Sequence, residues 1–492
     1  MISLGVDIGG TGCKCVAFQE DGTQLTLSYL EYPNPSGNVN LDADVLREAV
    51  FSVIRSCVRE LPDKGEVAAI TVSSFGESFV PVDRTGKPMT DIILYFANSE
   101  SDDFDRLIAS VGGDTVMEIT RILPDASYSL SKMLYTKKIV TDEVWKYLFV
   151  ASYLSFCLSG QTVCDESLAC RSLLYDVKRH DWSDELLKVA GIRREQLPEV
   201  KKTGAVTGTL LPALAEYFEL KENVKIVNGC HDQIVNALGA GVCNCAEAVD
   251  TTGTCECITP LFAQMPGLDV VKNNYACVPY LDERGYVTYA YNISAGSVVK
   301  WYRDALNAHL GSQAEKEGCS IYDLLNRTCP KEPTELLVLP FLQGMGGTPD
   351  VDPTATGLVA GLTTGTKLPD VYRAILEGLC FEMLYNLEKL EAGGIQTGRL
   401  YACGGGARSE VWLQIKADVW GREIVPVKTE ETGALGSAIL GFAAVRGVSS
   451  VCDLAKNFVR HGQPVLPNPE YHTYYRKKYE KYKLLREFYQ DF

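Results

Sequence analysis

The segment Asp7-Ile8-Gly9-Gly10-Thr11 follows a short apolar run at the start of the chain, and Asp250-Thr251-Thr252-Gly253-Thr254 repeats its pattern near the middle. Each copy lies between two β-rich runs, so each predicts a hairpin with a glycine-threonine turn. A tight turn of this kind exposes backbone N–H groups that bind anions. Two such hairpins facing each other can hold the phosphates of one nucleotide and a metal ion. The repeat therefore predicts an ATP-using enzyme built from two related domains.

The length and the composition limit the class of protein. A chain of 492 residues is too long for a single hydrophobic core, so we expect two or three domains. The net charge of −16 disfavours nucleic acid and anionic membranes as partners. The sequence has no apolar run of about 18 residues and no signal-peptide pattern at its start. We therefore expect a cytoplasmic protein.

Hydrophobic periodicity divides the chain into two α/β halves, which we take as domains at 1–241 and 242–492. Residues from about 95 to about 220 are more helical and less regular, and they predict an insertion in the first domain. The tail at about 470–492 is rich in tyrosine and lysine and predicts a helix that packs against the body of the protein.

The first hairpin contains the groups that a phosphate site needs. Gly10 lets the backbone approach a phosphate closely, Thr11 can donate a hydrogen bond, and Lys14 adds positive charge. Asp7 would repel a phosphate, so we interpret it as a Mg²⁺ ligand that acts through water. The alternative is an ordinary glycine-rich turn, which the repetition of the pattern at Asp250 disfavours.

A second glycine-rich segment, Gly404-Gly405-Gly406-Ala407, lies between a predicted strand and a predicted helix from 407 to 420. Such a turn places helix N–H groups against a nucleotide. The spacing matches neither a Walker loop nor a dinucleotide fingerprint. Close packing of the helix on the strand explains the glycines equally well at this point.

The segment Gly229-Cys230-His231-Asp232-Gln233 follows a predicted strand at 224–228, and we expect a turn at Gly229-Cys230 and a helix from His231. The carboxylate of Asp232 can accept a proton from a hydroxyl that attacks a γ-phosphate. Its alternative role is that of an ordinary acid in a helical first turn. His231 predicts a structural role or a sugar contact. Glu77, in the loop after a buried strand, can accept hydrogen bonds from sugar hydroxyls or can be a solvated loop acid.

Seventeen cysteines are scattered along the chain, and several lie in apolar runs, which indicates buried reduced thiols. One cluster is a candidate zinc site, and it consists of Cys243, Cys245, Cys255 and Cys257. Their spacing matches structural zinc sites poorly, and core packing explains a Cys-x-Cys pair on a strand.

Taken together, these segments resemble the FGGY family of carbohydrate kinases, and the resemblance runs from residue 2 to about 446. It implies an α/β fold of two ribonuclease-H-like domains of the actin/hexokinase/Hsp70 ATPase type around a central cleft. The segments that carry it, in chain order, are 7–14, 229–233, 250–256, Gly296 with Trp301, 353–362 (PTATGLVAGL), 374–378 (AILEG), 402–421 (ACGGGARSEVWLQIKADVWG) and 432–438.

The resemblance also implies roles for residues of this chain. Asp232 corresponds to the catalytic base of the family, and ATP would lie mostly against the second domain with Mg²⁺ near Asp7. The residues implied to contact ATP or its phosphates are Gly10, Thr11, Lys14, Thr252, Gly253, Thr254, Gly296, Gly404, Gly405, Gly406, Ala407 and Ser409. The residues implied to face the sugar are Glu77, Asn98, His231, Asp232 and Gln233.

The chain departs from the family where the substrate would bind. Phe75-Gly76-Glu77 stands where xylulokinases have a Met-His-Gly turn and glycerol kinases an Arg-Glu pair. The segment 95–100 lacks the acid and the arginine of the Trp-x-Asp-x-Arg element, and Asn98 is the residue left to replace that acid. Gln233 after the base resembles glycerol kinases more than xylulokinases.

We therefore predict ATP-dependent phosphorylation of a terminal hydroxyl of a small sugar, with a ketopentose such as xylulose as the first candidate. A short polyol or another ketose is the alternative, because Glu77 and Gln233 favour it. Two rivals of other classes are a sugar-binding regulator without activity and an Hsp70- or actin-like ATPase. The sequence leaves the oligomeric state open, with a homodimer as one candidate assembly.

Overall fold

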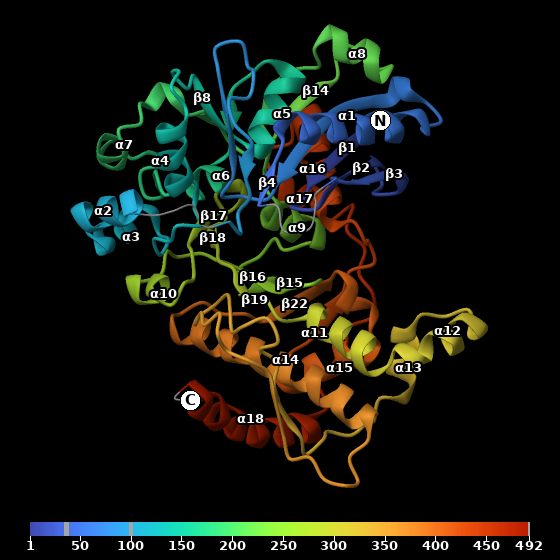
Figure 1. The fold of residues 1–492 in the computed structure, drawn as a ribbon. Helices are drawn as coiled ribbons and strands as arrows, with labels where there is room; N and C mark the ends of the chain where they lie inside the picture. Colours follow the sequence, from blue (N-terminus) through green and yellow to red (C-terminus); the bar gives the residue numbers. More distant parts are fainter. Residues whose placement is uncertain (34–38, 98–101, 491–492) are drawn as a thin grey trace.

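The structure is a computed structural model that describes residues 1–33, 39–97 and 102–490. It has two mixed β-sheets, each covered by helices, which form an upper and a lower lobe in Figure 1. The N-terminus lies in the upper lobe and the C-terminus in the lower lobe. None of the helices in the described ranges is long and apolar enough to cross a membrane.

The first sheet has the strand order β13-β14-β5-β1-β2-β3. The first predicted hairpin lies inside it as the antiparallel pair β1 and β2, with Asp7 opposite Lys14. β5 pairs in parallel with β1, and β14 pairs in parallel with β5. The strands are β1 (Ile2–Ile8), β2 (Gly12–Gln19), β3 (Gln24–Glu31), β5 (Val67–Ser74), β13 (Val206–Thr209) and β14 (Lys225–His231).

The second sheet has the order β17-β18-β16-β15-β22-β23, with β19 also pairing with β16. The second predicted hairpin is its antiparallel pair β15 and β16, and β22 pairs in parallel with β15. The strands are β15 (Glu247–Thr252), β16 (Glu256–Phe262), β17 (Val278–Pro279), β18 (Tyr286–Val287), β19 (Ala290–Asn292), β22 (Arg399–Cys403) and β23 (Ile424–Pro426).

Apart from β5 and β13 of the first sheet, the described region between β3 and β14 contains short strand pairs and helices. The strand pairs are β4 (Asn40–Leu41) with β7 (Ile92–Ile93), β6 (Phe79–Val82) with β8 (Lys146–Phe149), β9 (Val163–Cys164) with β12 (Glu199–Val200), and β10 (Tyr175–Asp176) with β11 (Asp181–Trp182). The helices up to β14 are α1 (Ala43–Arg59), α2 (Asp102–Val111), α3 (Gly113–Thr120), α4 (Ser129–Ile139), α5 (Val150–Ser159), α6 (Glu166–Cys170), α7 (Asp184–Ala190) and α8 (Pro212–Phe218).

Ten α-helices follow β14 in the described residues. They are α9 (Asp232–Ala240), α10 (Leu268–Lys272), α11 (Gly296–Trp301), α12 (Gly311–Glu317), α13 (Ile321–Thr328), α14 (Leu368–Ala392), α15 (Glu410–Trp420), α16 (Thr432–Arg446), α17 (Val451–Ala455) and α18 (Pro469–Gln490). One further strand pair, β20 (Leu337–Leu339) with β21 (Leu358–Ala360), packs beside α14.

α16 comes from the second half of the chain but packs on the first sheet and on α9 (Figure 1). Small residues make this possible, because a Cβ at Gly436 would lie 1.9 Å from the carbonyl oxygen of Val235 in α9. A Cβ at Gly239 of α9 would likewise lie 1.9 Å from the carbonyl oxygen of Thr432. The two helices therefore cross with their backbones in contact, and α16 joins the hydrophobic core of the first sheet.

The C-terminal helix α18 packs against α14 and α15 of the lower lobe (Figure 1). Tyr475, Tyr479 and Tyr482 are fully buried in this contact. Glu377 of α14 accepts hydrogen bonds from Tyr475 at 2.8 Å and from Lys478 at 2.5 Å. The aromatic residues of the tail thus pack against the body of the protein.

Candidate active site

The carboxyl ends of three strands meet at one edge of the first sheet. Ile8 of β1 and His231 of β14 both pair with Ser74 of β5. The loops that follow these strands therefore leave the sheet side by side, which is where ligands bind in open α/β sheets. These loops carry the first glycine-threonine turn, Glu77 and Asp232.

The first hairpin presents a lysine held between two carboxylates. Lys14 Nζ lies 3.3 Å from Asp7 Oδ2 and 2.7 Å from Glu431 Oε2, which belongs to the loop before α16. Burial raises the pKa of Asp7, and Lys14 opposes this shift. Burial would lower the pKa of Lys14, but Asp7 and Glu431 outweigh it and keep that pKa above its usual value. Lys14 is therefore a protonated cation at the base of the turn.

The tip of this hairpin is a backbone turn closed by the Gly9 N–H, which donates to the Gly12 carbonyl oxygen at 2.9 Å. Thr11 is exposed at the tip, and Gly10 is half-buried. A Cβ at Gly10 would lie 3.0 Å from the ring of Tyr95, so a larger residue would press on that ring. The turn therefore leaves the backbone of Gly10 and the hydroxyl of Thr11 accessible, with Tyr95 beside them.

Asp232 is the first residue of α9 and lies next to the buried imidazole of His231, with His231 Nε2 3.4 Å from Asp232 Oδ1. Burial raises the pKa of Asp232 to about 7, and the negative charges of Asp7 and Glu77 contribute to this shift. Burial and the charge of Arg171 lower the pKa of His231 well below its usual range, so its ring is neutral. Asp232 is thus a carboxylate that can gain and lose a proton near neutral pH.

The expected turn at Gly229-Cys230 is wrong in detail, because β14 continues through both residues to His231. A Cβ at Gly229 would lie 1.9 Å from the carbonyl oxygen of Val72 in β5. The glycine is needed for this close approach between strands and not for a turn. The helix consequently begins one residue later than expected, at Asp232.

Glu77 lies in the loop after β5 in a left-handed backbone conformation, with φ of 60°. Its side chain is buried and forms an ion pair with Arg171, which follows α6. The buried ammonium of Lys132 in α4 donates to the Glu77 carbonyl oxygen at 3.0 Å. Sequence analysis missed both cations, although a lone arginine in the mostly apolar segment 168–175 is a signal for a buried ion pair.

The second hairpin differs from the first in the role of its aspartate. Lys416 of α15 donates to Asp250 Oδ2 at 2.5 Å and to Thr252 Oγ1 at 2.6 Å, and all three side chains are buried. Glu256 lies 2.7 Å from the same ammonium. The hydroxyl of Thr252 is therefore committed to the protein interior, whereas Gly253 and Thr254 are exposed at the tip of the hairpin.

Gly296 packs against the tip of the second hairpin. Its N–H donates to the Gly253 carbonyl oxygen at 3.1 Å, and a Cβ at this position would lie 2.2 Å from the same oxygen. Only glycine fits here, because any side chain would displace the hairpin. The contact fixes the N-terminus of α11 beside Thr254.

Gly404 and Gly405 are exposed where β22 ends, at the same edge of the second sheet as Gly253, because Thr251 of β15 pairs with Cys403 of β22. Gly404 has φ of 80°, and Gly406 is buried against the side chain of Thr252. Residues 405–408 form a 3₁₀ turn, so α15 begins at Glu410 and not at Ala407 as expected. Ser409 caps this helix by accepting a hydrogen bond from the Trp412 N–H at 3.2 Å.

Two predicted sugar-facing residues remain. Asn98 lies outside the described residues. Gln233 follows Asp232 in α9, and its buried Oε1 has no hydrogen-bond partner in the described part of the chain. A buried amide oxygen without a partner is costly in a folded protein, so this atom marks a place for a ligand or water.

The four clustered cysteines make separate contacts. Cys243 is buried and donates to the Cys452 carbonyl oxygen at 3.4 Å, and Cys245 contacts the Arg284 carbonyl oxygen. Cys257 lies 3.7 Å from the hydroxyl of Thr259, and Cys255 is exposed. Within the described residues, no group of three or more histidine, cysteine, aspartate or glutamate side chains is arranged to hold a metal ion.

The residues around the first hairpin fit a magnesium ion that brings most of its own ligands. Asp7 and Glu431 provide carboxylate oxygens on either side of the Lys14 ammonium. Carboxylate oxygen is a donor type that Mg²⁺ prefers. Mg²⁺ in kinases is held by one or two carboxylates, by waters and by substrate phosphates. A site with only two protein carboxylates therefore fits Mg²⁺ that arrives with a nucleotide.

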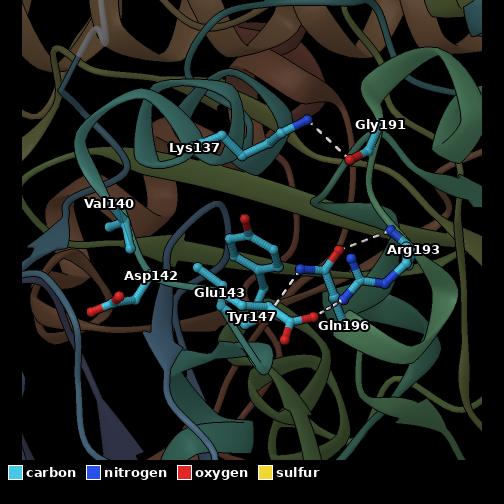
Figure 2. A pocket seen from close by; sticks show the side chains of 9 residues that line it. Lys137, Val140, Asp142, Glu143, Tyr147, Gly191, Arg193 and Gln196 are labelled. Atoms are coloured by element: carbon cyan, nitrogen blue, oxygen red, sulfur yellow. Dashed lines mark hydrogen bonds and ion pairs between the residues drawn. The ribbon is translucent and has the colours of Figure 1, made fainter.

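A separate cavity of about 210 Å³ lies on the inserted region, and Figure 2 shows its lining. Several of its polar groups are already paired with each other or with the backbone: Lys137 donates to the Gly191 carbonyl oxygen at 2.9 Å, and Gln196 donates to the Val144 carbonyl oxygen at 2.9 Å. Arg193 pairs with Glu143. The cavity contains none of the residues around Asp232, and we do not assign the reaction to it.

Comparison with known proteins shows that two domain models of one family match this chain. The N-terminal domain model of the FGGY family of carbohydrate kinases matches residues 2–239, and the C-terminal domain model matches residues 251–445. The gluconokinase of Bacillus subtilis (strain 168) is 27% identical over 472 residues, which cover 93% of this chain and 91% of the relative. The glycerol kinase of Thermococcus gammatolerans is 28% identical over 469 residues, covering 90% and 89%.

The fold has a close match among solved structures. The crystal structure of ligand-bound xylulose kinase from Lactobacillus acidophilus superimposes with a TM-score of 0.88 at 23% sequence identity, covering 99% of this chain and 98% of that one. At this identity the match concerns the fold alone. The relatives are named for different substrates, so their names do not decide between substrates for this chain.

Proposed function

Because the chain belongs to the FGGY family of carbohydrate kinases, which are ATP-dependent phosphotransferases, we propose that it transfers the γ-phosphoryl group of ATP to a terminal hydroxyl of a small sugar. The observation that carries the proposal is the position of Asp232. It lies at the carboxyl edge of the first sheet, where burial first and then the charges of Asp7 and Glu77 raise its pKa to about 7. A carboxylate of this kind can take the proton from a hydroxyl as its oxygen attacks phosphorus.

The two hairpins and the glycine-rich turn are the proposed nucleotide site. Lys14 leaves its carboxylate partners to meet the phosphates, and Mg²⁺, held near Asp7 and Glu431, supplies charge neutralisation when bound. The proposed contacts to ATP and its phosphates are Gly10, Thr11, Lys14, the backbone of Thr252, Gly253, Thr254, Gly296, Gly404, Gly405, Gly406 and Ala407. Ser409 acts there by capping the helix that follows the turn.

A neutral sugar is the substrate that the charges around Glu77 favour, with a ketopentose such as xylulose as the first candidate. Glu77 and Arg171 neutralise each other at the sugar end of the site. The alternative substrate is a short polyol or another ketose, which Glu77 and Gln233 favour. The gluconokinase relative adds a sugar acid, gluconate, as the charged substrate against which this proposal must be tested.

The assignment of Asp232 is tested with Asp232→Asn, which keeps the size of the side chain and removes the proton acceptor. We expect sugar-dependent ADP release to fall by about 10²- to 10⁴-fold, the usual contribution of a general base, with nucleotide affinity unchanged. Steady-state kinetics with a panel of pentuloses, hexuloses and polyols measures the loss, and calorimetric titration with ADP measures the affinity.

Asp184→Asn is the matched control, because Asp184 is also the first residue of a helix but is exposed on the inserted region. This variant should retain full turnover. Near-normal sugar phosphorylation by Asp232→Asn would contradict the role of Asp232. If the unaltered protein binds sugars but releases no ADP with any of them, it is a sugar-binding regulator and not a kinase.

A further inference from the structure

Two nitrogen atoms of Arg171 contact the same carboxylate oxygen of Glu77. Its Nε donates to Glu77 Oε1 at 2.5 Å, and its Nη2 contacts the same oxygen. The guanidinium lies over the ring of Tyr128 at 4.8 Å and near that of Tyr289 at 5.5 Å. These contacts fix the plane of the guanidinium, while the second oxygen of Glu77 and the Nη1 group of Arg171 remain outside the ion pair. Within the described residues, the pair therefore retains an acceptor oxygen on Glu77 and a donor nitrogen on Arg171 that their mutual contact does not use.

The backbone around Glu77 is built to hold this arrangement. A Cβ at Gly76 would lie 2.7 Å from Cγ of Arg171 and 3.0 Å from Cδ2 of His231, so only glycine lets both side chains pack on the loop. Lys132 holds the Glu77 carbonyl oxygen at 3.0 Å. A left-handed glutamate costs energy unless its surroundings fix it, so the loop is organised around the direction of this side chain.

Among the described residues, buried polar atoms without partners lie on two residues beside the pair, Tyr289 and His231, and on Gln233, which follows Asp232 in α9. Tyr289 Oη, His231 Nδ1 and Gln233 Oε1 are buried, and none has a hydrogen-bond partner in the described part of the chain. The ring of Tyr289 lies 5.3 Å from that of His231, which is next to Asp232. A ligand that carries several hydroxyls could supply the missing hydrogen-bond partners of these atoms.

We propose that Glu77 and Arg171 together determine the charge of the substrate: the neutral pair binds neighbouring hydroxyls of an uncharged sugar and excludes sugar acids. A carboxylate substrate would gain no net attraction from a cation that is already neutralised, and it would meet the negative charge of Glu77. This inference rests on the proposed kinase function and adds the substrate class and Arg171 as a specificity-determining residue.

The test removes the negative charge of Glu77 and leaves the positive charge of Arg171 in place. Glu77→Gln keeps the shape of the side chain and leaves Arg171 as an uncompensated cation in the pocket. We expect the ratio of kcat/KM for gluconate to kcat/KM for xylulose to rise at least about tenfold, a change of about 1.4 kcal/mol in relative transition-state binding. The double variant Glu77→Gln/Arg171→Gln removes one charge of each sign, so it has the same net charge as the unaltered protein and should return the ratio toward that of the unaltered protein.

Glu143→Gln is the control, because it removes the acid of another Glu–Arg pair, which is exposed on the surface far along the chain. It should leave the ratio unchanged. Stabilisation against heat by each sugar without ATP provides a second readout, which shows that each variant is folded and whether it binds gluconate.

The possible failures are distinguishable. If Glu77→Gln lowers activity with both sugars equally, or if the unaltered protein prefers gluconate to every neutral sugar, the proposed role of the pair is wrong while the kinase function stands. If no sugar stimulates ADP release from the unaltered protein, the kinase function itself fails, and the thermal readout still decides whether the pocket selects uncharged sugars.

Discussion

The reactivity of the proposed base, Asp232, depends on its surroundings. Burial first, and then the charges of Asp7 and Glu77, raise its pKa to about 7. Only the deprotonated carboxylate can accept a proton from the substrate, so the active form is lost as the pH falls below this value. We expect kcat/KM for the sugar to fall about tenfold per pH unit below about pH 7 and to level off above it, as steady-state rates at several pH values would show.

The charge of Glu77 provides an internal check on this pH profile. Because Glu77 raises the pKa of Asp232, Glu77→Gln should move the midpoint of the profile to lower pH, and Glu143→Gln on the surface should not. A profile that is flat from about pH 8 to about pH 5 would show that proton transfer to Asp232 does not limit the reaction.

For single residues, the sequence predicts side-chain pairings that lie within one local motif. It does not predict pairings between residues that are far apart in the chain. Asp7 and Lys14 face each other because they share a hairpin, and the hairpin pattern predicts this. Glu431 meets Lys14 from the other half of the chain, and Arg171 meets Glu77 across 94 positions. Pairing over such distances depends on tertiary packing, which no local pattern encodes.

The two hairpins are alike as elements but hold their aspartates differently. Asp7 is at the accessible edge beside Lys14, whereas Asp250 is fully buried against Lys416 and fixes the hairpin to α15. A buried ion pair of this kind needs both partners, since removal of one leaves an uncompensated charge. The repeated pattern thus predicted both hairpins correctly, but it could not predict that only the first aspartate faces the site.

The crossing of α9 and α16 connects the helix that carries the proposed base, Asp232, to the second half of the chain. Gly436→Ala would place a methyl group 1.9 Å from the Val235 carbonyl oxygen, so the helices must move apart. We expect a loss of roughly 1–3 kcal/mol in stability and a lower thermal midpoint, because overpacking forces backbone shifts. We also expect a lower kcat, because α9 carries Asp232. Differential scanning fluorimetry and sugar-dependent ADP release measure the two effects.

Gly311→Ala is the matched control for this substitution. Gly311 begins α12, and a Cβ there would meet nothing within 4 Å. Alanine is favoured over glycine in a helix, so this variant should be as stable as the unaltered protein or slightly more stable. If Gly436→Ala behaves in the same way, the two helices are not in the close contact described above.

For the whole molecule, the arrangement of the site predicts closure of the two lobes. The proposed base and sugar contacts end or follow strands of the first sheet, and Gly253, Thr254 and Gly404 follow strands of the second. The side chain of Asp232 is 30% exposed, so water can reach the base in this conformation. A kinase that left this access open would transfer phosphate to water as well as to the sugar.

We therefore expect the radius of gyration to decrease when sugar and nucleotide bind together, and to decrease less with either ligand alone. Asp232→Asn is the suitable protein for this measurement, because it should bind ATP and sugar without consuming them. Small-angle X-ray scattering of the free protein, of each binary complex and of the ternary complex provides the comparison. Equal radii in all four states, with binding confirmed by calorimetry, would mean that the lobes do not close and that water is excluded by local loops such as the one carrying Tyr95.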